Sequence, residues 1–320
     1  MDKATLVIQQ EIAQFEEYFK EAVKSRVPLL DRIMRYLVNR KGKQLRPKFV
    51  LLSARLGGQI SNHTLRAASL VELLHTATLV HDDVVDDADE RRGFFSVNAL
   101  WKNKVAVLVG DYLLSKGLLL SLDNNDFEVL KILSEAVKMM SEGELLQIEK
   151  ARNLNIREDI YYEIIKGKTA SLLSSACGAG ACTTFKDPAQ VQKLKLFGEK
   201  TGMAFQIKDD LFDYGSANVG KPTGNDIKEK KLTLPLIYTL NNCDKATRNK
   251  IIYIVKNNNT DQTKVRYVID TVHNAGGIDY ATKKMFAFRD EALSILHEFE
   301  QNEIRDALEE LVRFTTDRSF

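Results

Sequence analysis

Hydrophobic residues recur along most of the chain at intervals of three and four positions. Between residues 70 and 80 this spacing is kept by Leu70, Leu73, Leu74, Ala77 and Val80. It returns further along the chain at Leu130, Leu133, Val137 and Met140. Such a period places the apolar side chains on one face of an α-helix. The pattern therefore predicts one helix after another.

The distribution of proline supports long helices. The five prolines stand at 28, 47, 188, 222 and 235, so residues 48–187 contain none. Because proline interrupts helices and is common in turns, a proline-free run of that length favours helices over a turn-rich β protein. We expect breaks at Gly57-Gly58, 123–126, 186–188, 215–224, 257–260 and Gly276-Gly277. With no linker, low-complexity tract or fixed-period repeat, the sequence predicts one all-α domain over residues 1–320, with roughly a dozen helices.

Composition and charge narrow the class of partner. The chain has 320 residues, and 44% of them are hydrophobic, which is enough for a large core. Lysine and arginine number 46 against 44 aspartates and glutamates, so the net charge is only +2. We therefore expect no nucleic acid as partner and no electrostatic attachment to a membrane surface.

The cysteines and the N-terminus indicate a cellular compartment. Cys177, Cys182 and Cys243 form no CxxC pair, which favours packed thiols in a reducing environment. Residues 1–23 are amphipathic and lack the apolar run of a signal peptide. We expect no window to approach the ~18 apolar residues of a membrane helix. The expectation is a cytoplasmic protein without stable membrane anchoring.

Residues 80–93, VHDDVVDDADERRG, concentrate six carboxylates between Asp82 and Glu90. We place the stretch from Asp82 to Asp87 at the end of an apolar helix. There Asp82 and Asp86 lie a turn apart on one face, with Asp83 beside them. Converging carboxylates form the oxygen-only site that Mg²⁺ prefers. The plainer interpretation is a solvated acidic helix end, neutralised by the two arginines that follow.

A second stretch, AFQIKDDLFDY at 204–214, repeats this spacing with Asp209, Asp210 and Asp213. It also closes an apolar helical pattern, where unpaired carboxylates are costly. If the two clusters faced each other, six carboxylates would lack a counter-charge. Mg²⁺ ions completed by phosphate oxygens would supply it, since Mg²⁺ is usually held by one or two carboxylates plus substrate phosphate. The paired motifs therefore predict a diphosphate that is bound through metal.

A diphosphate also attracts direct cations, and short motifs offer several. The candidates are Lys43 and Arg46 in GKQLRP, Arg91 and Arg92, Lys168 beside Thr169, Lys221 and Lys231. Each one alone is compatible with a solvated surface base, but together they suggest two diphosphate sites, one through metal and one through basic residues. His75, two turns before Asp82, is either a hydrogen-bonded helix histidine or a diphosphate donor.

Two other motif classes are set aside. Residues 215–222, GSANVGKP, match a P-loop only in part, because Pro222 replaces the required Ser or Thr and a helix precedes the loop. There is no HExxH and no Cys/His cluster, which makes zinc an unlikely ligand.

From about residue 40 to residue 240 the chain resembles the trans-isoprenyl (polyprenyl) diphosphate synthases, most closely those of the octaprenyl type. The resemblance is carried, in order and spacing, by GKQLRP, LVHDDVVDDADERRG, GDYLL at 110–114, GKTASLL at 167–173 and FQIKDDLFDYGSANVGKPTGNDIKEKKLTLP. It implies an all-helical fold around a deep central cavity, usually in a homodimer. It also implies an enzyme that condenses isopentenyl diphosphate with an allylic prenyl diphosphate.

The resemblance implies roles for particular residues. Asp82, Asp83, Asp86, Asp209, Asp210 and Asp213 would bind up to three Mg²⁺ ions and the allylic diphosphate. Lys43, Arg46, His75 and Arg92 look like the isopentenyl diphosphate site. Arg91, Lys168, Thr169, Gln206, Lys221 and Lys231 look like the allylic side, with Lys168 also counted among the catalytic groups. Asp87 departs mildly, because many relatives carry glutamate there.

The length of the product follows from the residues that precede the first cluster. In this fold the growing chain is expected to run along the helix, away from the aspartates, and one helical turn of 5.4 Å is about one isoprene unit. Thr78 and Ala77, four and five residues before Asp82, are small where short-chain synthases commonly place an aromatic floor, and Leu74 below them is medium-sized. We expect a product of C30 to C50, best C40, for quinone side chains. The alternative is that Ala77 is ordinary helix packing and another helix forms the floor.

Three other functions remain open on the sequence. A short-chain synthase would make farnesyl or geranylgeranyl diphosphate. A terpene cyclase also uses Mg²⁺ and aspartates, but usually carries an NSE-type second motif. A non-catalytic subunit of a heteromeric synthase typically loses one aspartate cluster, whereas this chain keeps both.

Overall fold

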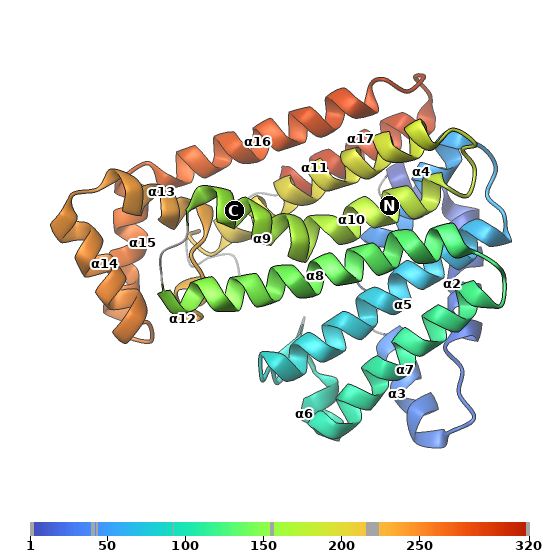
Figure 1. Ribbon diagram of the computed structural model, residues 1–320, viewed down its shortest axis with the longest axis horizontal. Helices are drawn as coiled ribbons and strands as arrows, with labels where there is room; N and C mark the ends of the chain where they lie inside the picture. Colours follow the sequence, from blue (N-terminus) through green and yellow to red (C-terminus); the bar gives the residue numbers. More distant parts are fainter. Residues whose placement is uncertain are drawn as a thin grey trace. The chain divides into compact units, whose positions relative to one another are not determined.

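The computed structural model describes residues 3–39, 42, 44–91, 93–153, 157–215 and 224–317, with only the backbone described at 91, 152 and 153. The fold is all-α, as predicted (Figure 1). In order the elements are α1 (Lys3–Val7), α2 (Gln9–Ala22), α3 (Pro28–Asn39), α4 (Leu45–Gly57), α5 (Asn62–Val85), β1 (Glu90–Arg91), β2 (Phe94–Phe95), α6 (Val97–Trp101), α7 (Asn103–Leu122), α8 (Phe127–Asn153), α9 (Glu158–Ile165), the π-helix η1 (Lys166–Ala170), α10 (Ser171–Ala181), α11 (Pro188–Phe212), α12 (Asn225–Lys228), α13 (Leu234–Asn242), α14 (Lys245–Asn257), α15 (Gln262–Asn274), α16 (Gly277–Leu296) and α17 (Glu303–Thr316). Thirteen helices within the described ranges have nine or more residues, which agrees with the dozen expected.

The chain forms two compact units. Unit 1 comprises Met1–Val137, Ser175–Lys195 and Phe299–Leu308, and unit 2 comprises Lys138–Ser174, Leu196–Glu298 and Glu309–Phe320. The borders between them fall inside α8, α10, α11 and α17. The first aspartate cluster belongs to unit 1 and the second to unit 2.

Unit 1 is built around α5, which packs against α2, α4, α6 and α7, and α5 and α7 run side by side in Figure 1. Gly117 permits this close approach, because a Cβ there would lie 2.7 Å from a Leu70 methyl. One cluster of its core contains Val23, Ile33, Met34, Leu73, Ala77, Val80, Val97, Ala106, Val109 and Leu113. At the other end of α5, Arg66 donates two hydrogen bonds to Asp126, at 2.5 and 2.9 Å, and this ties the helix to the turn before α8.

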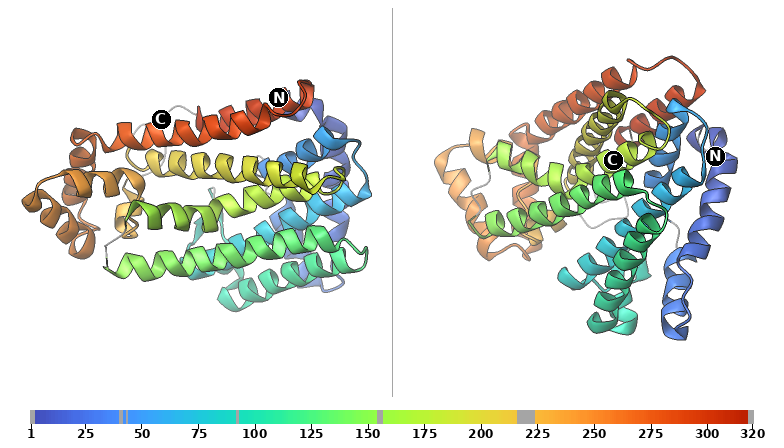
Figure 2. Two further views of the ribbon diagram at one scale, coloured as in Figure 1. Left: turned by 45° about the horizontal axis from the view of Figure 1, so that its top comes forward. Right: turned by 45° about the vertical axis from the view of Figure 1, so that its right-hand side comes forward.

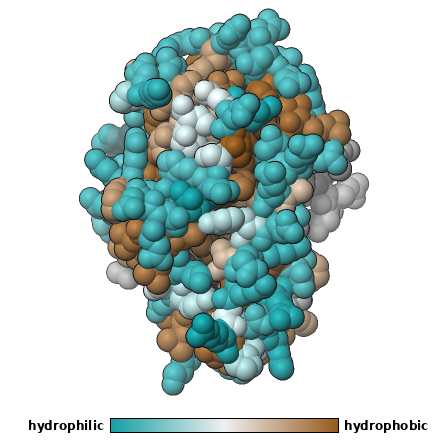
Figure 3. Space-filling model, turned by 90° about the vertical axis from the view of Figure 1, so that its right-hand side faces the viewer, coloured by the Kyte–Doolittle hydropathy of each residue, from teal (hydrophilic) through white to brown (hydrophobic). Residues whose placement is uncertain are grey.

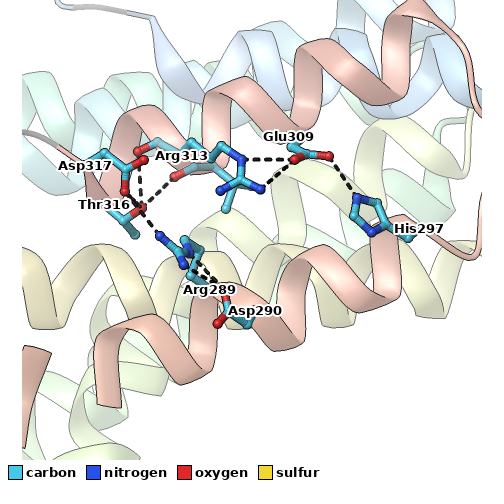
Figure 4. Close-up of polar contacts among 8 residues, drawn as sticks. Arg289, Asp290, His297, Glu309, Arg313, Thr316 and Asp317 are labelled. Atoms are coloured by element: carbon cyan, nitrogen blue, oxygen red, sulfur yellow. Dashed lines mark hydrogen bonds and ion pairs between the residues drawn. The ribbon is translucent and has the colours of Figure 1, made fainter. Parts of the chain in front are cut away.

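Unit 2 has a core of its own, formed by side chains of α9, α11 and α13 to α16. Helix α13 packs against α16, α15 and α9, and Figure 2 shows the orange helices α13 to α15 grouped at one end of α16. The last residues of α17 are held to α16 by charged groups (Figure 4). Arg289 reaches Asp317 at 3.3 Å, and Glu309 accepts from His297 at 2.8 Å and from Arg313. These hydrogen bonds, that of His297 first, lower the pKa of Glu309.

The predicted breaks agree with the observed helix ends. Helix α4 ends at Gly57, α7 and α8 are separated by residues 123–126, and α11 begins at Pro188. Breaks also fall at 257–260 and at Gly276, while residues 216–223 of the remaining predicted break lie outside the described residues. The sequence did not predict the β1–β2 hairpin, which pairs Glu90 with Phe95, or the π-helix η1.

One prediction about the surface was wrong. Helix α7 is long and apolar enough to cross a membrane by length and composition, although no window was expected to approach this. The evidence for a span is weak, since core helices of soluble proteins pass the same test. One side of α7 packs on α5, while Val107, Leu108, Leu118, Leu119 and Leu122 are exposed. Exposed apolar side chains also occur on other elements, and the face drawn in Figure 3 shows hydrophobic groups among hydrophilic ones.

The three cysteines are free, in agreement with the sequence. Cys177 is completely buried, and burial raises the pKa of its thiol to about 12. A thiol with so high a pKa is protonated and unreactive at neutral pH, which fits a packing role.

Candidate diphosphate and metal site

The first aspartate cluster lies where α5 ends. Asp82 is half-buried in the last turn, Asp83 is buried, and Asp86 is exposed at the C-cap. The expected helix through Asp87 is too long, because α5 ends at Val85 and Asp87 has a left-handed φ of +50°. Asp82 and Asp86 stay one turn apart, since the Asp86 amide donates to the Asp82 carbonyl at 2.8 Å.

The turn after α5 has a specific stop. The Ala88 amide donates back to the Asp83 carbonyl at 2.9 Å, which closes a Schellman-type turn around the left-handed Asp87. Aspartate tolerates this conformation better than most residues. The Ser96 hydroxyl then donates to the Ala88 carbonyl at 2.7 Å and accepts from the Ala99 amide at 3.2 Å, at the start of α6. Ser96 thereby fixes the end of the acidic turn to the start of α6.

His81 fixes the same turn against α7. Its Nε2 donates to the Val107 carbonyl at 3.2 Å and lies 3.6 Å from an Asp111 carboxylate oxygen. The ring occupies the space in front of Gly110, where a Cβ would lie 2.0 Å from Nε2. This contact gives a physical reason for the glycine of the GDYLL motif, because any side chain at that position would displace the residue next to Asp82.

The second cluster ends α11, but its three carboxylates lie in different surroundings. Asp209 is exposed, Asp210 is buried, and Asp213 is half-buried one residue beyond the helix. The Asp213 carboxylate accepts from the amides of Asn225, at 2.8 Å, and Asp226, at 3.1 Å. Its two oxygens therefore hold the first turn of α12 against the end of α11.

Asp210 is held by side chains. Its Oδ2 accepts from the Tyr161 hydroxyl at 2.7 Å, and its Oδ1 accepts from Gln206 Nε2 at 2.8 Å. Burial raises the pKa of Asp210 to about 7, although both hydrogen bonds act in the opposite direction. Among the residues that the structure describes, the Asp209 carboxylate has no hydrogen-bond or ion-pair partner. Asp209 is thus the member of this cluster that is available to a ligand.

Asp226 was missed by the sequence reasoning. It is part of α12, and burial, followed by the nearby Asp210 and Asp213, raises its pKa to about 8. Lys231 is the positive charge that lowers the pKa of both Asp210 and Asp226, and it also pairs with Glu229. The only sequence signal for Asp226 is its place in GNDIKEKK directly after the second cluster.

The π-helix η1 brings the KT pair to the second cluster. A Cβ at Gly167 would lie 2.8 Å from the Met139 carbonyl, and one at Gly143 would lie 2.9 Å from the Lys168 amide, so backbone packs directly on backbone. π-turns of this kind are frequent at functional sites. Lys168 forms an ion pair with Glu144, and the Thr169 hydroxyl donates to Gln206 Oε1 at 2.6 Å.

The remaining predicted cations are only partly described. In unit 1, Arg46 is half-buried in the first turn of α4 and His75 is buried in α5. Arg91 lies in β1, and only its backbone is described. Lys43, Arg92 and Lys221 lie outside the described residues. Within unit 2, Gln206 links Thr169 to Asp210, and the positive charge of Lys231 acts on Asp210.

The residues that the sequence assigned to chain length lie on α5. Ala77 is completely buried and belongs to the unit 1 core cluster with Leu73, Val80 and residues of α3, α6 and α7. Leu74 is buried, whereas Thr78 is half-buried and donates its hydroxyl to the His75 carbonyl at 2.9 Å. Of the three, Thr78 is the most exposed.

The donor set fits a hard cation that also takes phosphate oxygens. Within the described ranges, no three His, Cys, Asp or Glu side chains form a ready-made metal site. The available ligands are carboxylate oxygens, and in the second cluster only Asp209 has both oxygens unengaged. Mg²⁺ commonly uses one or two carboxylates and completes its shell with water and substrate phosphate, so this set suits it.

Comparison with known proteins defines the class. The family model described as polyprenyl synthetase matches residues 27–272. The chain is 37% identical to the all-trans-nonaprenyl-diphosphate synthase (geranyl-diphosphate specific) of Rhodobacter capsulatus over 314 residues, 97% of this chain and 96% of that protein. It is 31% identical to the octaprenyl diphosphate synthase of Escherichia coli (strain K12) over 320 residues, 99% of each chain.

A solved structure agrees with these matches. The polyprenyl synthase of Caulobacter crescentus, complexed with calcium and isoprenyl diphosphate, is 32% identical and superimposes with a TM-score of 0.91 over 99% of this chain and 97% of that one. The chain therefore belongs to the polyprenyl synthetase family, and the resemblance seen in the sequence is confirmed. It is a trans-prenyltransferase of the long-chain type.

Proposed function

We propose that this enzyme condenses isopentenyl diphosphate with an allylic prenyl diphosphate, in a Mg²⁺-dependent reaction, to make an all-trans polyprenyl diphosphate of C30 to C50. Octaprenyl diphosphate, C40, is the best single assignment, and a quinone side chain is its expected use. The observation that supports it most is the arrangement in unit 2, where the unengaged Asp209 carboxylate stands next to Asp210. Gln206 links Asp210 to Thr169 of η1, the neighbour of Lys168.

The proposed roles follow the charges. Of the six aspartates that the resemblance assigns to Mg²⁺, the three of the first cluster and Asp209 would hold the ion directly, and Asp210 and Asp213 would support Asp209. When bound, Mg²⁺ neutralises the leaving diphosphate. Arg91, Lys168, Thr169, Gln206, Lys221 and Lys231 would bind the allylic diphosphate, and Lys43, Arg46, His75 and Arg92 would bind isopentenyl diphosphate. A lysine provides a point charge, and an arginine provides a bidentate donor to phosphate.

The chemistry requires charge stabilisation more than a side-chain base. The allylic C–O bond breaks heterolytically to give an allylic cation and diphosphate, and Lys168 and Lys231 favour this by stabilising the developing negative charge. The double bond of isopentenyl diphosphate, held nearby, attacks the cation and forms the new C–C bond. Loss of a proton, which we assign to the released diphosphate as acceptor, leaves an allylic diphosphate five carbons longer.

We assign chain length to α5. Ala77 and Thr78 place no bulky side chain one turn before Asp82, so the growing chain would pass them. The half-buried Thr78 is the better candidate for the wall, since Ala77 is packed among other core side chains.

We further propose that units 1 and 2 act as one synthase domain in the cytoplasm, without stable membrane anchoring.

A homodimer is proposed from the exposed side of α7. Val107, Leu108, Leu118, Leu119 and Leu122 fall within about 120° of arc at ~100° per residue, opposite the side that packs on α5. A row of large apolar residues on an exposed helix commonly marks a protein interface. We expect a second copy to cover it, through a two-fold axis that pairs α7 with itself. Leu119→Glu should then give a monomer in light scattering, and the equally exposed Leu6→Glu should leave the dimer intact.

A product assay tests the proposed function. The purified protein is incubated with Mg²⁺, farnesyl diphosphate and labelled isopentenyl diphosphate, and the dephosphorylated prenols are sized. Prenols of C30 to C50 would support the reaction and the long product. A C20 product would retain the reaction and contradict the open path past Thr78. No incorporation with either a farnesyl or a dimethylallyl primer would contradict catalysis by this chain alone and point to a missing partner subunit.

A further inference from the structure

We infer that Tyr161 is a positioning residue of this site. Its hydroxyl, together with the Gln206 amide, holds the Asp210 carboxylate inside the bundle, so that Asp209 is the carboxylate presented to metal and diphosphate. The inference rests on the proposed metal role of the second aspartate cluster, and it adds a residue that no sequence motif identified.

The geometry around Asp210 carries the argument. Tyr161 is 4% exposed and Asp210 is 6% exposed, so their 2.7 Å hydrogen bond is shielded from water. Gln206 occupies the other carboxylate oxygen at 2.8 Å. With one donor on each oxygen, Asp210 is fixed in one rotamer, and rotating it toward a ligand would leave the buried Tyr161 hydroxyl without an acceptor. Such a loss is costly in a dry environment.

The orientation of Gln206 is itself determined. Because the Asp210 carboxylate only accepts, the Gln206 NH₂ group lies on the Asp210 side and Oε1 on the other, where it accepts from the Thr169 hydroxyl at 2.6 Å. A chain of hydrogen bonds therefore runs from η1 through Gln206 to Asp210 and ends at Tyr161 of α9. It links the proposed diphosphate donor Thr169 to the carboxylate next to Asp209.

The neighbouring Tyr162 provides a matched comparison. It lies on the same helix and also donates to a carboxylate, with its hydroxyl 2.8 Å from Glu158 Oε1. Glu158 also accepts from Tyr280, at 2.7 and 2.8 Å, and this cluster does not include the aspartates of the second motif. Removal of either hydroxyl deletes one tyrosine–carboxylate hydrogen bond from α9, but only Tyr161 acts on the proposed metal site.

The experiment compares Tyr161→Phe with Tyr162→Phe. Binding of Mn²⁺ in the presence of inorganic diphosphate is followed by electron paramagnetic resonance, kcat and KM for the allylic diphosphate are measured, and the melting temperature is recorded without metal. Groups that position a metal ligand through its neighbours, as Tyr161 would position Asp209 through Asp210, are expected to contribute about 10- to 100-fold in metal affinity. We expect Tyr161→Phe to raise the Kd for Mn²⁺ by about 10- to 100-fold and to lower kcat. We expect Tyr162→Phe to bind Mn²⁺ within about twofold of the wild type, because Glu158 keeps its bonds to Tyr280.

Equal Mn²⁺ affinity in the two variants would overturn the inference, whatever happens to their melting temperatures. If Tyr161→Phe does not fold, Gln206→Met removes the donor on the other oxygen and is expected to weaken Mn²⁺ binding in the same way; unchanged affinity there would overturn the inference equally. A wild-type protein that binds no Mn²⁺ with diphosphate would instead contradict the proposed function of the cluster itself.

Discussion

The two aspartate clusters share the spacing D-D-x-x-D, yet the protein builds them differently. In unit 1 the cluster lies at the capped end of α5, where Asp86 is an exposed C-cap and the chain turns away through Asp87. In unit 2 the cluster is engaged by the protein, because Asp210 accepts from two side chains and Asp213 accepts from two amides of α12. Only Asp209 of that cluster is exposed without a described partner.

The difference shows that a shared spacing brings the three carboxylates close together but does not determine which of them bond to the protein and which are available to a ligand. The second cluster uses two of its three carboxylates to hold its own structure together. Its third carboxylate is therefore placed on a rigid support, as a site that must orient a diphosphate requires. The turn that carries the first cluster is supported by other residues, by His81 against Gly110 and by Ser96.

The largest expected effect is on the first cluster. Asp82→Ala removes a proposed ligand and should lower kcat/KM on the order of 10³-fold, because charge stabilisation at the leaving group is the main catalytic demand. Asp89→Ala removes the same charge from the same acidic stretch, at an exposed position outside the motif, and should retain near-wild-type activity. Steady-state kinetics with saturating Mg²⁺ checks both. Near-normal turnover of Asp82→Ala would remove the metal assignment.

The second cluster should separate activity from stability. Asp209→Ala is expected to lose roughly 10²-fold in kcat/KM with unchanged stability, since its carboxylate holds no protein group. Asp213→Ala leaves the amides of Asn225 and Asp226 without an acceptor and should lower the free energy of unfolding by about 1–2 kcal/mol. Urea denaturation and kinetics measure the two effects. If Asp213→Ala were fully stable but inactive, Asp213 would be a ligand and not a structural acceptor.

The pH dependence of the free energy of unfolding distinguishes the buried carboxyls from the exposed ones. Burial raises the pKa of Asp210 to about 7 and of Asp226 to about 8, above the ~3.9 of an unfolded aspartate. Between the unfolded value of ~3.9 and these raised values, the folded chain binds more protons than the unfolded chain. The free energy of unfolding therefore falls as the pH rises, until both carboxyls are ionised in the folded chain. Between pH 6 and pH 9 the metal-free protein should lose about 1–4 kcal/mol.

The matched variant for this profile is Asp226→Asn, which should flatten the upper part of the curve. Addition of Mg²⁺ with diphosphate should weaken the dependence, because a nearby cation favours the ionised carboxylates. Chemical denaturation at several pH values provides the measurement. A metal-free protein that gains stability from pH 6 to pH 9 would show that these carboxyls are ionised in the folded state already at pH 6.

The smallest effect concerns α5 below the first cluster. Thr78→Phe should shorten the product by one or more isoprene units with little change in kcat for the first condensation. Ala77→Phe must fit a completely buried position and is expected to destabilise the protein by about 1–3 kcal/mol, in addition to any shortening. Sizing of the prenols and thermal melts separate the two. Unchanged product length in both variants would place the floor on another helix.

Much of the fold could be predicted because its signals are local. The three-and-four spacing predicted the helices, and Gly57-Gly58, 123–126 and Pro188 predicted where they end. The hairpin Glu90–Arg91 with Phe94–Phe95 was missed, since its strands are two residues each. The π-helix was also missed, because it depends on the contact of Gly143 with Gly167, which are 24 positions apart in the chain.

Candidate site residues could be recognised from the sequence where they are charged and stand in short motifs. The aspartates, Lys168, Thr169 and Lys231 stand in recognisable motifs, and their assignment to a diphosphate site stays a prediction. In the sequence Tyr161 looks like an ordinary aromatic residue of an apolar helix. Its hydrogen bond to Asp210 depends on the packing of α9 beside a residue 49 positions further along the chain. The capping role of Asp213 likewise depends on where α12 lies, which spacing alone does not determine.

The most direct test of this account is a crystal structure of the protein with Mg²⁺ and inorganic diphosphate. The account predicts metal on carboxylates of the first cluster and on Asp209, with Asp210 still bonded to Tyr161 and Gln206, and Asp213 still bonded to the amides of α12. Density that shows Asp210 or Asp213 turned away from these partners and coordinating metal would contradict it.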